Sequence, residues 1–197
     1  MNIRNVTDIH GVFSGIEVGV MFNSNRELVL CNEHDNRDDP DNTFLQELID
    51  FEESLTIVLD IKARGVMIAY ELADAIYENI QNSIHNWRLC SLNEMCVNRL
   101  LRLGCQNVGI VTSGLSLQLY TQMDIDFVSI DYEIAGADIL NTLRALDIEI
   151  YIWGIKRVRP ELQADAYIIS NSGSAVSNWS PNVSHNTHGT DGVSPTL

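Results

Sequence analysis

The chain has 197 residues, a formal net charge of −15 and 45% hydrophobic residues, which suit one globular domain with a substantial core. Its negative charge argues against binding to a nucleic-acid backbone. No apolar run approaches the roughly 18 residues of a membrane span, and residues 1–10 hold no signal-peptide core, so a cytoplasmic location is expected. The four cysteines occur at no metal-like spacing and are expected to be buried thiols.

The N-terminal part of the chain is expected to form a helix followed by a hairpin. Apolar residues at helical spacing predict a helix over 2–13. Strand patterns over 15–22 and 27–31 flank a short polar turn and predict a β-hairpin. An acidic polar loop over 32–42 then leads into a helix expected over 43–53, capped by Asp41 or Asn42.

The apolar run over 54–63 gives the strongest strand signal in the chain. It leaves no polar face, as expected for a parallel strand that is covered on both sides. Asp60 and Lys62 share one side of this strand, because side chains in a strand repeat every second residue. Both stand near its carboxyl end, where parallel α/β folds bind ligands and carry out chemistry.

Strand and helix patterns alternate through the remainder of the domain. A helix is expected over 66–81, and the later strands are expected near 87–92, 107–112, 126–131, 149–154 and 166–170. Helices near 93–103, 115–123 and 136–146, with a short segment over 160–163, separate these strands. The alternation predicts right-handed βαβ units and a parallel sheet.

About seven core strands in this length favour a (β/α)8 TIM-barrel-like α/β fold over a doubly wound sheet. No glycine-rich phosphate loop follows the first strand, which also disfavours the doubly wound alternative. The barrel is expected to be incomplete and to carry the hairpin as an insertion after its first strand. It is expected to span 1–171, with a disordered polar tail over 172–197.

Together these segments resemble the glycerophosphodiester phosphodiesterase family across about residues 2–170. In that family one barrel strand carries Glu-x-Asp, a hairpin leads to His-Asp, the next barrel strand carries Glu-x-Lys, and a Trp lies on the seventh strand. The matching segments here are 15–20, 30–33, 59–62, 152–153 and 165–170. The resemblance implies a barrel that hydrolyses a small phosphodiester to an alcohol and glycerol phosphate with the help of a divalent metal.

Individual positions follow the family only in part. By the resemblance, Glu17 and Asp60 would hold Mg²⁺ or Ca²⁺, while Lys62 and Trp153 would bind the substrate. Gly19 stands where the family has a second carboxylate, so any metal is expected to bind weakly. Asn32 occupies the position of a catalytic histidine and cannot shuttle a proton. His34, two residues later, is the nearest alternative acid–base group.

The family's first strand, which ends in His-Arg-Gly, has no expected counterpart, because the chain is predicted to start at its first helix. The strands over 15–22 and 166–170 would then leave an open barrel edge. A second copy of the chain, another chain or a covering segment is expected to pair with that edge. Two functions stay open: a degenerate phosphodiesterase with weak or no activity, or a non-catalytic barrel that binds a phosphate-bearing ligand or a partner.

Overall fold

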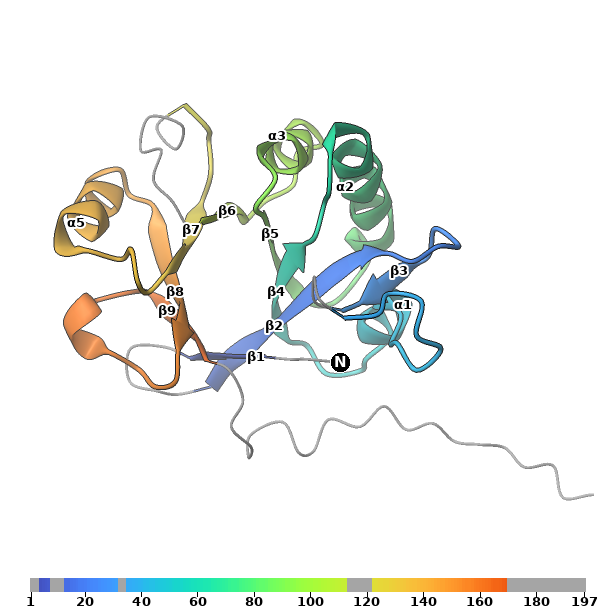
Figure 1. The fold of residues 1–197 in the computed structure, drawn as a ribbon, viewed down its shortest axis with the longest axis horizontal. Helices are drawn as coiled ribbons and strands as arrows, with labels where there is room; N and C mark the ends of the chain where they lie inside the picture. Colours follow the sequence, from blue (N-terminus) through green and yellow to red (C-terminus); the bar gives the residue numbers. More distant parts are fainter. Residues whose placement is uncertain (1–3, 8–12, 32–34, 113–121, 170–197) are drawn as a thin grey trace, which may run out of the picture.

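The computed structural model describes residues 4–7, 13–31, 35–112 and 122–169. Seven parallel strands follow one another around its central sheet (Figure 1). They are β2 (Phe13–Phe22), β4 (Thr56–Ile61), β5 (Asn86–Ser91), β6 (Val108–Thr112), β7 (Phe127–Asp131), β8 (Glu149–Ile155) and β9 (Ala166–Ile169). A short strand, β3 (Leu28–Leu30), pairs antiparallel with β2. This is the incomplete TIM-barrel-like α/β fold, with its hairpin, that the sequence predicts, because the described residues hold seven parallel barrel strands instead of eight.

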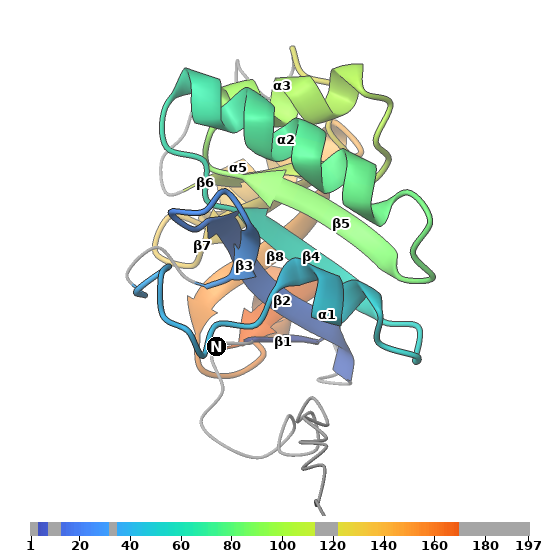
Figure 2. The same ribbon diagram turned by 90° about the vertical axis from the view of Figure 1, so that its right-hand side faces the viewer.

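Helices cover the outside of the sheet. They are α1 (Leu45–Ile49), α2 (Val66–Ile80), α3 (Glu94–Arg102) and α5 (Ala137–Ala145), with a 3₁₀ turn over Pro160–Leu162. α2 and α3 lie side by side over β4 and β5 (Figures 1 and 2). None of the helices in the described ranges is long and apolar enough to cross a membrane. The helix expected near 115–123 falls largely outside the described residues.

The helix expected over 43–53 is shorter than its sequence pattern, and neither Asp41 nor Asn42 caps it. Phe44 forms a β-bridge with Val29, so the helix starts only at Leu45. The Glu47 carboxylate accepts a hydrogen bond from the Phe44 backbone N–H (3.0 Å) and closes the first turn instead.

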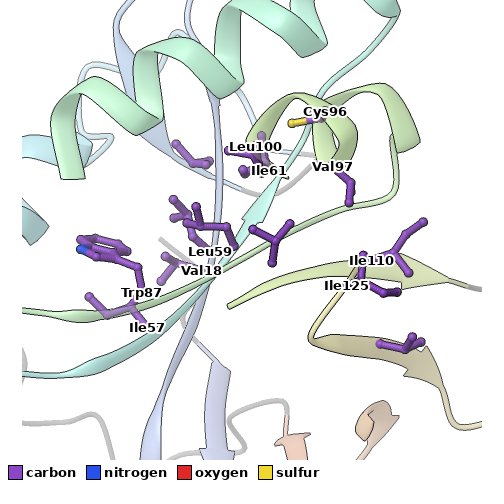
Figure 3. Close-up of a cluster of buried hydrophobic side chains, with 14 of the residues drawn as sticks. Val18, Ile57, Leu59, Ile61, Trp87, Cys96, Val97, Leu100, Ile110 and Ile125 are labelled. Carbon is purple, nitrogen blue, oxygen red and sulfur yellow. The ribbon is translucent and has the colours of Figure 1, made fainter. Parts of the chain in front are cut away.

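Residues on alternate sides of the strands form two separate apolar cores. The larger core lies between the sheet and the helices, and Val18, Leu59 and Leu100 are among its fully buried members (Figure 3). The smaller core fills the inside of the sheet, where Val58, Phe127 and Tyr151 meet. This alternation places Glu17 and Asp60 on the inner side, because the residues directly before and after each of them in the strand belong to the outer core.

The expected N-terminal helix is wrong at residues 4–7, which form the strand β1 (Arg4–Thr7). β1 pairs antiparallel with the first half of β2 on one side and with β9 on the other. Val6 is 2% exposed and joins the inner core. Without β1, the edges of β2 and β9 would be free to form backbone hydrogen bonds. Pairing with both edges favours an extended conformation over the helical preference of this short segment.

Of the partners expected for the open edge, a covering segment is the one that the structure shows, and it comes from this chain. β1 covers β2 as far as Glu17, and the hairpin covers the same edge of β2 from Gly19 onward. β1 thus closes a ring of eight strands within the described residues. A free edge at this place no longer gives a reason to expect a homo-oligomer.

Candidate anion and metal site at the barrel mouth

Asp60 and Lys62 lie at the carboxyl end of β4, and we call this end of the barrel the mouth. Glu17 lies midway along the neighbouring strand β2. Gly19 lies directly opposite Asp60 in the parallel register, and Glu17 lies opposite Val58. With the standard spacing between strands and the standard rise per residue, the Cα atoms of Glu17 and Asp60 are then roughly 8 Å apart. Both carboxylates are buried, at 3% and 5% exposure. The two acidic residues expected to share a site are thus neighbours on adjacent strands.

Lys62 is bound to Asp60 at this mouth. Its ammonium donates a short hydrogen bond to Asp60 Oδ2, and its side chain is 22% exposed. Burial alone would lower the pKa of Lys62, but the Asp60 carboxylate, its hydrogen bond and the charge of Glu17 together raise that pKa above its usual value. Lys62 therefore carries a firmly held positive charge at neutral pH.

Gly19 has a steric role that its sequence position does not reveal. A Cβ atom placed on Gly19 would lie 2.4 Å from the backbone oxygen of Cys31 and 3.3 Å from Lys62 Cε. The Cys31 N–H also donates a hydrogen bond to the Gly19 oxygen (3.0 Å), which holds the hairpin against this point. The space that a second carboxylate would need is taken by the hairpin backbone and the Lys62 stem.

The carboxylates suit a divalent cation only in part. Asp60 Oδ1 is buried and makes no hydrogen bond to any described residue, so it is oriented like a free ligand atom. No group of three or more potential metal-ligating side chains occurs in the described parts of the chain. Glu17 and Asp60 are therefore the side chains that could bind a hard cation, and water would supply most of the coordination. One oxygen of Asp60 is already bound to the Lys62 ammonium.

Trp153 lies across the ring, on β8. It is paired in register with Asp131 and packs against the inner core. Its indole N–H donates to the Ser129 backbone oxygen (3.3 Å), which fixes the ring. Trp153 is thus placed as an inner wall and does not contact the Asp60–Lys62 pair in any interaction found among the described residues.

The opposite end of the barrel interior is plugged. Arg88 forms an ion pair with Glu149 (2.5 Å) and lies over the rings of Tyr151 and Phe127, at 5.4 and 6.0 Å. A Cβ on Gly109 would lie 2.6 Å from the Phe127 ring, so glycine makes room for this filling. A ligand therefore has to approach from the mouth.

Sequence reasoning missed Cys90, which lies opposite Asp60 on β5 and faces the same interior. Burial, followed by the charges of Asp60 and Glu17, raises the pKa of its thiol well above the usual value. Cys90 is therefore neutral and is no nucleophile at neutral pH. Side chains in the strand over 86–91 alternate between the two faces of the sheet, and this alternation could have placed Cys90 beside Asp60. All four cysteines are unpaired thiols; Cys31, Cys90 and Cys96 are buried, as expected, whereas Cys105 is half-buried.

Asn32 and His34 lie outside the described residues. Their roles therefore stay predictions. The described chain resumes at residue 35, in a segment that lies beside the hairpin turn.

Comparison with known proteins supports the family by fold. No family model matches the sequence, and no curated protein matches it. A glycerophosphodiester phosphodiesterase from Parabacteroides distasonis superposes with a TM-score of 0.63 at 11% identity, over 82% of this chain and 84% of that one. A phosphodiesterase from Oleispira antarctica, in complex with the product sn-glycerol-3-phosphate, gives 0.62 at 12% identity, over 78% and 79%. The chain thus shares the fold of glycerophosphodiester phosphodiesterases.

Proposed function

We propose that this chain binds a small phosphodiester or phosphate monoester at the barrel mouth and hydrolyses it slowly or not at all. The observation that carries the proposal is the ion pair between buried Asp60 and half-buried Lys62, near Glu17, in a barrel that shares its fold with phosphodiesterases. Lys62 supplies the positive charge for a phosphoryl oxygen. The glycerol phosphate in the Oleispira protein suggests the class of ligand.

A divalent cation is part of this proposal as a weak, auxiliary ligand. Glu17 and Asp60 would hold it, and its chemistry would be to neutralise a bound phosphate. Asp60 remains bonded to Lys62 through its other oxygen, so Lys62 would stand beside the bound phosphate with or without the metal. Trp153 would limit the space for the ligand on the opposite side of the barrel.

A calorimetric titration with sn-glycerol 3-phosphate tests the proposal, with and without Mg²⁺. We expect saturable binding that Lys62→Gln weakens about 10-fold or more, because a charge-assisted hydrogen bond is lost. Arg102→Gln is the matched control, since it removes one positive charge from the exposed end of α3. Because the pKa of Lys62 is raised, binding should not decline between pH 7 and 9. A complete lack of saturable binding under both conditions would refute the proposal.

A further inference from the structure

Lys62 lies at the centre of a tight turn that follows β4. The Ala63 N–H donates a hydrogen bond to the Ile61 backbone oxygen (3.0 Å), two residues earlier, which makes these three residues a γ-turn. The Lys62 N–H donates to the Val20 oxygen on β2 (2.9 Å), so the turn is still joined to the sheet on that side. We call the segment over 61–65 the Lys62 turn. The direction of the Lys62 side chain depends on how this turn is held.

Ser91, the last residue of β5, holds the start of the Lys62 turn. Its side chain is fully buried, and its hydroxyl donates a hydrogen bond to the Ile61 oxygen (2.6 Å). The Asn93 N–H donates to the Ser91 hydroxyl oxygen (3.1 Å), which orients the hydroxyl toward Ile61. Ser91 thus fixes the residue that precedes Lys62.

Asn93 holds the other half of the Lys62 turn. Its side-chain amide donates hydrogen bonds to the backbone oxygens of Ala63 (3.1 Å) and Gly65 (3.4 Å). Its side-chain oxygen accepts a hydrogen bond from the Met95 N–H (3.0 Å) and caps α3. The backbone carbonyls on both sides of Lys62 are therefore bound by side chains from one neighbouring loop.

These side chains extend the link between β4 and β5 beyond the sheet. Backbone pairing of the two strands ends at Asp60 and Cys90. Further along the chain, the side chains of Ser91 and Asn93 bind the carbonyls that follow β4. Capping α3 uses only the side-chain oxygen of Asn93, and a serine would serve a helix as well. The amide group of Asn93 is thus left for the Lys62 turn.

We propose that Ser91 and Asn93 are positioning residues, which hold the Lys62 ammonium against Asp60 at the barrel mouth. Lys62 donates its hydrogen bond to Asp60 from a backbone that these two side chains keep in place. An ammonium has three N–H donors, and the bond to Asp60 uses one of them. The same fixed geometry aims the other donors at a phosphoryl oxygen, a consequence that rests on the function proposed above.

Ser91→Ala and Asn93→Ser test this role in calorimetric titrations of the full chain with sn-glycerol 3-phosphate. Ser91→Ala removes the hydroxyl, whereas Asn93→Ser keeps a helix cap and removes the amide donors. We expect each variant to weaken binding about 3- to 10-fold, the loss typical of one or two hydrogen bonds. Ser54→Ala is the matched control, since the Ser54 hydroxyl binds the Ile84 backbone oxygen (3.0 Å) at the opposite end of β4. The control should stay within about 2-fold.

A double-mutant cycle separates positioning from a general loosening of the fold. If Ser91 and Asn93 act through Lys62, their losses overlap with the loss caused by Lys62→Gln. In the Lys62→Gln protein, we therefore expect Ser91→Ala and Asn93→Ser to change the remaining binding by less than about 2-fold. Losses that add in full to that of Lys62→Gln would overturn the proposal.

NMR of the protein without ligand or metal, at one fixed pH, measures the positioning directly. A held lysine side chain gives distinct signals for its two Hε protons, and a freely rotating one gives nearly equal signals. The Lys62 Hε signals should be distinct in the unmodified chain and in Ser54→Ala, and should converge in Ser91→Ala and Asn93→Ser.

The NMR result decides the positioning role even if the proposed function fails. Absence of glycerol phosphate binding by the unmodified chain would refute the function, while the Lys62 signals would still test the two positioning residues. Lys62 signals that stay distinct in the folded variants would overturn the positioning role. Asn93→Ser remains informative if Ser91→Ala fails to fold, because it keeps the cap of α3.

Discussion

Gly19 lies between the Cys31 carbonyl and the Lys62 side chain, in a gap that leaves no room for a Cβ atom. We therefore expect Gly19→Ala to lower the free energy of unfolding by about 1–3 kcal/mol, through overpacking. Urea denaturation of both proteins measures the difference. Gly19→Asp should destabilise the chain at least as much, so it should not add a working metal ligand.

Gly136→Ala is the control for that prediction. Gly136 precedes α5, has a φ of −74°, and a Cβ there would lie 4.0 Å from its nearest neighbour, Ile139. The control should cost less than about 1 kcal/mol, the loss of a modest N-cap preference. Equal stability changes at positions 19 and 136 would contradict the steric argument.

A divalent cation at Asp60 would lie close to the Lys62 ammonium, which repels it and already neutralises that carboxylate. We expect Lys62→Met to strengthen Mg²⁺ binding in calorimetry, because Asp60 then needs a new positive partner. Glu17→Gln should weaken Mg²⁺ binding, because one of two protein ligands is lost. If Glu17→Gln leaves Mg²⁺ binding unchanged, the metal binds elsewhere, most plausibly along the acidic segment over 33–41.

At the scale of elements, β1 replaces an open edge with backbone pairing. We expect Val6→Asp to lower the free energy of unfolding by roughly 3 kcal/mol or more, because it buries a charge in the inner core. The freed edges of β2 and β9 should then promote association, seen as larger species in sedimentation. Val66→Asp is the matched control, since Val66 is 52% exposed. A stable, monomeric Val6→Asp protein would show that β1 is dispensable.

β1 also marks the limit of what the sequence can predict. The run over 54–63 predicts β4 correctly, because Leu55, Ile57, Val58, Leu59 and Ile61 supply apolar side chains to both faces of the strand. The four residues of β1 carry too little pattern of their own, and distant strands decide their conformation. In the site, the alternation of side chains along the strand correctly predicts that Asp60 and Lys62 lie on the same side. The obstruction at Gly19 depends on the path of the hairpin, which no local pattern encodes.

At the scale of the whole molecule, the ring has the shape of a phosphodiesterase barrel but a different eighth strand. β1 runs antiparallel, so its amino end lies toward the mouth and its carboxyl end lies at the plugged end. It therefore cannot present a His-Arg-Gly turn after its carboxyl end at the mouth, as the family's first strand does. By the resemblance, Asn32 stands at the other histidine position, so we infer that neither family acid–base group is present at its matching position.

We accordingly expect the unmodified chain to release glycerol phosphate from a glycerophosphodiester slowly or not at all, with Mg²⁺ or Ca²⁺ present. General acid–base groups contribute about 10²–10⁴-fold each, so losing both removes most of the rate. Asn32→His alone should restore little, because groups that act as a unit are strongly non-additive. The same assay on Glu17→Ala and His34→Ala supplies the decisive comparison. Robust turnover that both variants abolish would contradict this prediction and make His34 the catalytic acid–base group.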